Sequence, residues 1–472
     1  MILFLLPVTL PTETEAQYTY VTNNGMVTIT QYSGPGGSVS IPSVIGDLPV
    51  ISIASFAFSS ATNVTSVTIP DGITNIGFEA FYSCAALADI SIPSSTTIIG
   101  DWAFQNCTNL TTIAVNPLSS AFSSMDGVLF NKDKITLVAC PGGKTGSYAI
   151  PNTTKNIGVG AFGGCTGLRV ISIPNSVTNI SDSAFYSCTS LASATIPNGV
   201  INIGNSAFYS CSSLTNLTLG DDVTSIADYA FASCVGLGHA TMGSKVASVG
   251  YGAFLGDGLL SISIPDSVTN IGAAAFEYCS NLTSVIIGNN LASIPNFAFD
   301  ACTSLTGVTL RKGVTSIGVD AFGRCGSLTI VTIPGSVTNI GDSAFLNCGR
   351  LSAMFFLGSP PHLGSLVFSG DSTIAYYLPQ ALGWGATFGS LPTVAWNPQV
   401  QTSDGSFGVK ANRFGFNIKG SSNLVIVVEA SLSLADAHWS ALQTNVLTGG
   451  SDYFSDPQWT GYRLRFYRIR PP

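Results

Sequence analysis

A 23-residue repeat constrains this chain more than any other feature of its sequence. The dipeptide Ala-Phe occurs twelve times in register, and the eleven steps between its phenylalanines are nine of 23 residues, one of 22 and one of 58. The 58-residue step contains an irregular insert at about 116–154. A period of 20–50 residues is typical of repeat architectures, in which each unit contacts only its neighbours. The phenylalanines are Phe58, Phe81, Phe104, Phe162, Phe185, Phe208, Phe231, Phe254, Phe276, Phe299, Phe322 and Phe345.

The order of residues inside each repeat predicts its local structure. Cys302, Leu305, Val308 and Leu310 are one example, in which the last two apolar residues alternate with Thr309. This period of two predicts a short strand, which Pro or Gly then ends. A segment such as "VTSIG" predicts a second extended side, and we expect the "xxAFxxC" stretch to form a single helical turn. One repeat cannot bury its apolar residues alone, so the sequence predicts a β-rich solenoid of stacked repeats with short parallel strands.

A cysteine holds the same place in ten repeats. Metal binding has little support, because no CxxC spacing occurs anywhere in the chain. Parallel side chains on neighbouring repeats have Cβ atoms too far apart for an unstrained disulfide. An unpaired cysteine behaves as a small buried hydrophobe. We therefore expect core thiols, with some disulfides between neighbouring repeats as the alternative. The ten are Cys84, Cys107, Cys165, Cys188, Cys211, Cys234, Cys279, Cys302, Cys325 and Cys348, and Cys140 stands apart from them.

The pattern "CxxLxxVxIPxxVTxIGxxAFxxC" resembles the BspA-type, or Treponema-type, leucine-rich repeat of bacterial surface and secreted proteins. The resemblance covers about residues 41–357, and the insert resembles a variant repeat of the same family. Ala61 and the stretch 256–258 depart from the pattern, since the cysteine is lost there. The resemblance implies a curved solenoid that acts by binding, and some relatives are adhesins. It identifies no ligand and supplies no catalytic residue.

The ends of the chain differ from the repeats. Residues 17–40 alternate polar and apolar residues around Asn24-Gly25, which predicts a β-hairpin cap. We expect residues 358–398 to form the closing cap and a linker. Residues 399–472 contain five apolar stretches that predict a small all-β sandwich-like module, and it resembles a C-terminal module of secreted proteins from environmental bacteria. Its alternating arginines predict one solvated strand face, with an anchoring or export signal as the alternative: Arg463, Arg465, Arg468 and Arg470.

Charge and hydropathy limit the partners and the location. Residues 1–398 carry a net charge of −10 and residues 399–472 carry +2. No basic stripe suited to phosphate contacts precedes residue 399, so we expect no nucleic-acid partner. No apolar run reaches the 18–20 or so residues of a membrane-spanning helix. Residues 1–16 are apolar from Ile2 to Leu10 and end in Ala16, which predicts a signal peptide although a basic start is missing, with an apolar start that has no role as the alternative. We expect a secreted or cell-surface protein.

The sequence offers no constellation for catalysis, a metal or a cofactor. The three histidines, His239, His362 and His438, are far apart in sequence. Gly158, Gly160 and Gly163 spell GxGxxG, but a dinucleotide site needs a strand before and a helix after it. Here the glycines belong to the repeat's own "IGxxAFxxC" segment. We therefore expect no enzyme, no cofactor and no metal.

The outward side of the predicted strands is the candidate binding face. Solenoids often bind along such a surface, although threonine also suits a solvated strand. Its candidate residues are Thr195, Thr218, His239, Thr241, Thr309, Thr332 and Phe355. A lone surface histidine is the other interpretation of His239, and cap packing with Tyr376 and Trp384 is the other one for Phe355. Two functions follow. One is an adhesin-like scaffold for a protein or glycan ligand, and the other is a structural envelope or matrix protein without a discrete ligand.

Overall fold

A computed structural model describes residues 15–434 and 438–472 of the chain. The predicted signal peptide at 1–16 lies almost entirely outside these described residues. The chain divides into two compact units, unit 1 up to Ser280 and unit 2 from Asn281 to Pro472, and each is described by itself. Three short 3₁₀ helices occur among the described residues: η1 (Glu15–Gln17), η2 (Thr448–Gly450) and η3 (Trp459–Gly461).

Unit 1 begins with a hairpin and a short two-sided stack. β1 and β2 pair antiparallel around Asn24-Gly25, both with positive φ, as the predicted hairpin requires. One sheet contains β1 (Tyr18–Asn23), β2 (Met26–Tyr32), β5 (Leu48–Ile53), β7 (Asn75–Ile76) and β9 (Ile98–Ile99), with β4 (Val44–Ile45) beside β5. The other contains β3 (Gly37–Ser40), β6 (Val64–Thr68), β8 (Asp89–Ile92) and β10 (Thr112–Val115).

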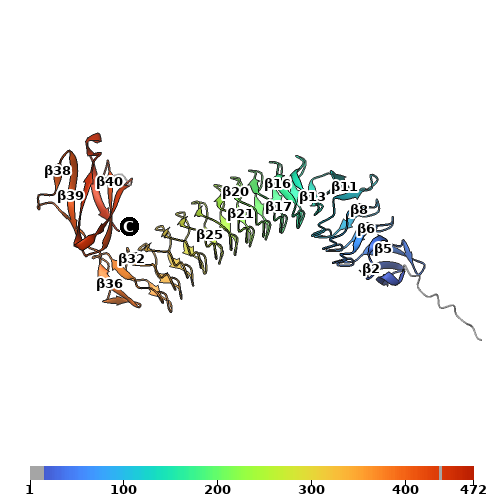
Figure 1. The fold of residues 1–472 in the computed structure, drawn as a ribbon, viewed down its shortest axis with the longest axis horizontal. Helices are drawn as coiled ribbons and strands as arrows, with labels where there is room; N and C mark the ends of the chain where they lie inside the picture. The colour runs from blue at the N-terminus through green and yellow to red at the C-terminus, as the bar shows by residue number, and fades with distance from the viewer. Residues whose placement is uncertain (1–14, 435–437) are drawn as a thin grey trace, which may run out of the picture. The chain divides into compact units, whose positions relative to one another are not determined.

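The rest of unit 1 starts at the insert. β11 (Phe122–Met125) and β12 (Val128–Asn131) form an antiparallel hairpin. They lead one row of strands, which continues as β13 (Thr136–Ala139), β15 (Asn156–Ile157), β17 (Asn179–Ile180), β19 (Asn202–Ile203), β21 (Ser225–Ile226), β23 (Ser248–Val249) and β25 (Asn270–Ile271). The other row is β14 (Gly146–Ala149), β16 (Leu168–Ser172), β18 (Ser193–Ile196), β20 (Asn216–Leu219), β22 (His239–Thr241) and β24 (Ser261–Ser263). Figure 1 shows both rows as parallel stacks, one containing β16 and β20, the other β17 and β21.

The "xxAFxxC" stretch is not helical, so the expected helical turn is wrong. It consists of successive tight turns, in which Ala80 N–H donates to Gly77 O (3.3 Å) and Cys84 N–H to Phe81 O (3.3 Å). Glu79 (φ 52°) and Ser83 (φ 55°) are left-handed at the third position of these turns, as in a type II turn. Between repeats, Phe81 N–H donates to Ala103 O (2.9 Å). These bonds between repeats exist only in the stack, and they hold non-glycine residues in a conformation that is uncommon for them.

Phenylalanine and cysteine form the core of the repeats. The rings of Phe185 and Phe208 are stacked with centroids 4.7 Å apart, close to the strand spacing of about 4.8 Å. All eleven cysteines are buried thiols. The prediction of core thiols is therefore confirmed, and the disulfide alternative is not realised. Each fully buried phenylalanine contributes roughly 1.5–3 kcal/mol of burial free energy.

The thiols also make hydrogen bonds, which the sequence pattern does not indicate. Cys211 Sγ donates to Phe185 O (3.2 Å), and Cys234 Sγ repeats this contact to Phe208 O (3.2 Å). The acceptor belongs to the turn of the preceding repeat. A thiol is a weak donor, but alanine or valine in its place would offer none. This contact explains why a cysteine and not another small hydrophobe recurs.

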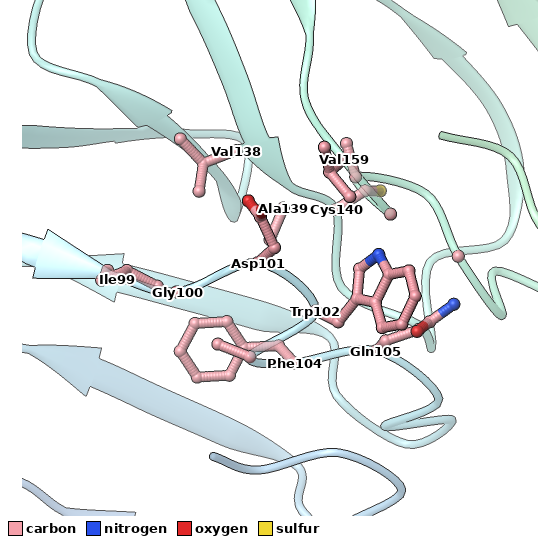
Figure 2. A pocket seen from close by; sticks show the side chains of 14 residues that line it. Ile99, Gly100, Asp101, Trp102, Phe104, Gln105, Val138, Ala139, Cys140 and Val159 are labelled. Atoms are coloured by element: carbon pink, nitrogen blue, oxygen red, sulfur yellow. The ribbon is translucent and has the colours of Figure 1, made fainter. Parts of the chain in front are cut away.

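The GxGxxG glycines create space for two side chains of an earlier repeat. A Cβ on Gly160 would lie 2.1 Å from Trp102 Cδ1, and one on Gly163 would lie 2.3 Å from Gln105 Nε2. Trp102 and Gln105 line a small cavity of about 20 Å³ together with Cys140 (Figure 2). Such a volume holds a water molecule and nothing larger. The motif therefore serves the packing of the repeats on either side of the insert.

Unit 2 contains further repeats and the C-terminal module. One row of strands is β26 (Ser284–Ile286), β28 (Gly307–Thr309), β30 (Ile330–Ile333), β32 (Ala353–Phe356), β34 (Ile374–Tyr377), β36 (Leu391–Ala395) and β35 (Thr387–Phe388). The second row is β27 (Ser293–Ile294), β29 (Ser316–Ile317), β31 (Asn339–Ile340) and β33 (His362–Leu363). The stack thus continues into residues 358–398, where Phe368 still stacks on Phe345 (6.2 Å).

The C-terminal module is all-β, as predicted, and has two sheets. The first is β37 (Gln399–Gln401), β39 (Arg413–Lys419), β38 (Gly408–Lys410) and β42 (Ser451–Asp456). The second is β41 (Ser440–Leu447), β40 (Leu424–Ser431) and β43 (Phe466–Arg470). Phe355 and Tyr376 of the repeats share one core with Phe416 and Leu424 of the module. Trp396 completes this shared core and donates from Nε1 to Val425 O (3.2 Å).

Candidate functional site

The candidate residues of unit 1 lie in register on one exposed surface. Thr195, Thr218 and Thr241 are aligned on β18, β20 and β22, and all three are exposed. We call the surface formed by Ser172, Thr195, Thr218 and Thr241 the outward strand face. It follows from the period of two, because the alternate residues Ala194 and Leu217 are buried in the core.

His239 belongs to a second polar row on the same strands. Asn216 on β20 is aligned with His239 on β22, which is aligned in turn with Ser261 on β24. These three residues are exposed. Two neighbouring polar rows therefore cover β20 and β22, and the histidine adds one imidazole to an otherwise hydroxyl and amide surface.

A shallow groove of about 680 Å³ crosses β16, β18 and β20. Thr195 and Thr218 lie in it, together with the turn residues Asn198 and Asp221. Asp221 N–H donates to Asn198 Oδ1 (3.0 Å), and Ser244 N–H donates to Asp221 Oδ1 (3.0 Å). The bond from Ser244 lowers the pKa of Asp221, which therefore stays ionised. The groove thus offers hydroxyls, an amide and a carboxylate at regular spacing, which can make hydrogen bonds with an extended ligand.

The candidates of unit 2 do not form one open surface. Thr309, Thr332 and Phe355 are aligned on β28, β30 and β32. Thr309 is exposed, whereas Thr332 is half-buried and donates its hydroxyl hydrogen to Pro472 O. Phe355 has 1% of its surface exposed and stacks on Tyr376 (5.0 Å). The prediction that Phe355 contacts a ligand is therefore wrong, because the C-terminal module covers this side chain. The alternative, that Phe355 packs in the cap, describes its role.

The arginines of the module do not form one solvated face. Arg465 forms an ion pair with buried Asp456 (2.5 Å) and is itself largely buried. Arg468 and Arg470 both pair with Glu429 of β40 (2.7 and 2.6 Å). Burial works against the charge of Glu429, but hydrogen bonds from Arg470 and Arg468 outweigh it and lower the pKa of this carboxyl. Sequence alone could not show this arrangement, since Glu429 lies about forty residues before its partners.

A second groove, the unit 2 cleft, lies between the repeats and the module. It has a volume of about 940 Å³, and Ile286, Thr309 and Ile330 of the strands line it. Arg468 and Arg470 of β43 line it as well. The alternation of these arginines in the sequence does not indicate a cleft.

Within residues 15–434 and 438–472, no group of three or more His, Cys, Asp or Glu side chains is placed to hold a metal ion. Across the same described residues, no helix has both the length and the hydropathy to span a membrane.

Two parallel rows of strands joined by tight turns, repeated about every 23 residues, define a leucine-rich-repeat solenoid scaffold. The family described as BspA type leucine rich repeat region matches residues 37–145, 133–260 and 249–375. These matches cover well over half of the chain, so the chain belongs to the BspA-type leucine-rich-repeat family.

Solved structures of bacterial repeat proteins are similar to this chain. A leucine-rich repeat protein from Bacteroides ovatus ATCC 8483 is 28% identical over 81% of this chain and 98% of its own, with a TM-score of 0.52. A leucine rich cell surface protein from Faecalibacterium prausnitzii A2-165 is 27% identical over 74% of this chain and 94% of its own, with a TM-score of 0.46. No curated protein matches the chain.

Proposed function

We propose that the protein is a non-catalytic binding scaffold, secreted or displayed on the cell surface, which holds a protein or glycan ligand on its outward strand face. The groove across β16, β18 and β20 is the observation that carries this proposal. It presents hydroxyl and amide groups in register on a rigid stack, so little conformational entropy is lost when a ligand binds. The resemblance to bacterial surface and secreted proteins supports the location.

Lysine substitutions test which surface binds. Thr195→Lys and Thr218→Lys place long cations in the groove, whereas Thr178→Lys and Thr224→Lys place them beside β17 and β21 of the other row, where both threonines are exposed. We expect the two groove variants to reduce binding to a glycan array or to immobilised matrix proteins about tenfold or more, which corresponds to about 1.4 kcal/mol.

The matched variants serve as the control. Thr178→Lys and Thr224→Lys should bind like the parent protein. The two groove variants should melt within a few degrees of it, because exposed substitutions change stability by about 0.5 kcal/mol or less. The two control variants should melt slightly lower, because each loses a hydroxyl bond to the preceding repeat, from Thr178 Oγ1 to Lys155 O (3.3 Å) or from Thr224 Oγ1 to Ile201 O (3.2 Å). Equal loss in both pairs, or no loss in the groove pair, would contradict the proposal. Absence of any ligand on either array would favour the structural alternative.

A further inference from the structure

The unit 2 cleft concentrates positive charge in a chain that has little of it. Four of the 17 lysines and arginines line it: Arg311 and Lys312 in the turn after β28, and Arg468 and Arg470 on β43. None of the residues lining it is an aspartate or glutamate. Counted against Glu429, the acidic partner of Arg468 and Arg470, the four cations leave a net charge of +3. The whole chain carries −8.

Glu429 fixes the two guanidinium groups without using all their donors. Arg468 bonds Glu429 Oε2 through Nε (2.8 Å), and Arg470 bonds Oε1 through Nε (2.6 Å). The Glu429 side chain is only 6% exposed, whereas Arg468 and Arg470 remain 48% and 41% exposed. A guanidinium carries five N–H donors. Arg468 also contacts Glu429 Oε2 through Nη2 (2.7 Å), and Arg470 donates from Nη1 to Pro471 O (2.6 Å), so Nη1 of Arg468 and Nη2 of Arg470 remain. The cleft therefore holds two preorganised cations with donors left for a carboxylate, the group that a guanidinium fork fits best.

The floor of the cleft adds apolar contact. Ile286 is aligned with Thr309, and that row continues to Thr332. Ile286 is 50% exposed although it occupies a position where most repeats carry Ser or Thr. The lining contains aliphatic side chains and threonine hydroxyls but no aromatic ring on which a sugar could stack. This combination favours a peptide with aliphatic and acidic residues over an acidic glycan.

We propose that the unit 2 cleft binds an acidic, extended peptide segment of a partner protein. Carboxylates of the segment pair with Arg468 and Arg470 and with Arg311 and Lys312, and an aliphatic side chain contacts Ile286. This inference rests on the proposed function only in treating the chain as a binding scaffold, since it concerns a different surface.

Binding of a defined peptide to the full chain tests the proposal. The probe is a fluorescent ten-residue peptide of alternating Glu and Val, compared with one of Gln and Val. We expect saturable binding of the Glu peptide only, weakened by salt because screening acts on exposed charges. Arg311→Gln and Lys312→Gln should each weaken it roughly three- to tenfold. Arg350→Gln removes an exposed cation that does not line the cleft and should change nothing.

A variant of the Glu429–Arg470 pair keeps the test independent of folding. Arg470→Gln alone leaves Glu429 with one partner fewer, so it is combined with Glu429→Gln, which keeps the total charge. The double variant should lose binding while its melting temperature shows that it folds. Equal binding of the Gln peptide, an equal effect of Arg350→Gln, or binding of an oligogalacturonate in place of the peptide would overturn the proposal. Thr218→Lys should leave peptide binding intact, so failure of the cleft proposal is distinguishable from failure of the proposed function.

Discussion

At the scale of single residues, one position per repeat shows how the stack is held. A cysteine there packs as a small hydrophobe and donates to the phenylalanine carbonyl of the preceding repeat, as Cys348 does to Phe322 O (3.2 Å). Two repeats place an aspartate at this position. Asp257 accepts from Cys234 N–H (2.8 Å) through Oδ1, whereas its Oδ2 has no hydrogen-bond partner. Burial raises the pKa of Asp257 well above its usual value, and burial raises that of Asp371 to about 7.

These aspartates make stability depend on pH. A carboxyl whose pKa is raised in the folded state contributes to the free energy of unfolding. This contribution is fully present below the unfolded pKa of about 4 and is lost as pH rises through the folded pKa. We expect Asp257→Cys, which restores the repeat, to be more stable than the parent at neutral pH by about 1–3 kcal/mol, the cost of a buried unsatisfied group. Melting temperatures of both proteins from pH 4 to pH 9 measure the difference.

The stability difference between Asp257→Cys and the parent should widen as pH rises. Asp371 is present in both proteins, so it affects both equally. Thr218→Ala removes an exposed hydroxyl and no charge and is the control, for which the difference in stability from the parent should stay constant. A stability gain of Asp257→Cys that is independent of pH would show that packing, not charge burial, accounts for it.

At the scale of elements, the sequence predicts the strands better than the turns. The alternation of buried and exposed residues is clear in strands such as β20, so the row that contains it could be predicted from the period of two. Strands of the other row, such as β21, have only two residues and follow from the recurring "VTSIG" segment. The turns could not be predicted, because Ser206 and Ser210 adopt positive φ with no glycine to indicate it. Their conformation is fixed by bonds from the next repeat, such as Ser206 N–H to Asp228 O (2.9 Å). Left-handed residues are therefore a property of the stack and not of the local sequence.

The packing beside the insert predicts an unequal cost for two glycine substitutions. Gly160 (φ +61°) and Gly256 (φ +71°) hold left-handed turn positions, but a Cβ on Gly160 meets Trp102 whereas one on Gly256 meets nothing within 4 Å. We expect Gly256→Ala to cost about 1 kcal/mol for the backbone conformation. Gly160→Ala should cost about 1–3 kcal/mol more through overpacking.

Denaturant unfolding of both variants measures these costs. Combining Gly160→Ala with Trp102→Ala should bring the extra cost of the glycine substitution close to zero, because the clashing ring is gone. If the extra cost persists without the indole, the close contact between Gly160 and Trp102 is not its cause.

At the scale of the whole molecule, the repeats account for the solenoid, and the repeat pattern changes where the N-terminal hairpin and the C-terminal module begin. The family and solenoid could be predicted from the sequence, since the same residues recur in register a dozen times. The coverage of Phe355 could not, because Phe416 and Leu424, which share its core, lie more than sixty residues further on. The unit 2 cleft could not be predicted either, because the residues that line it also come from segments far apart in the sequence. Contacts between segments without a repeat register have no periodic signal in a single sequence.

One labelling measurement tests the central claim that the outward strand face binds a ligand outside the cell. All native cysteines are buried, so a membrane-impermeant maleimide reports an introduced thiol. Thr218→Cys places a thiol in the groove and Thr224→Cys places one outside it. In intact cultures we expect the thiol at 224 to be labelled fully and the thiol at 218 to be labelled several-fold more slowly than in purified protein. Labelling only after lysis, or the same ratio of rates in cultures and in purified protein, would contradict the account.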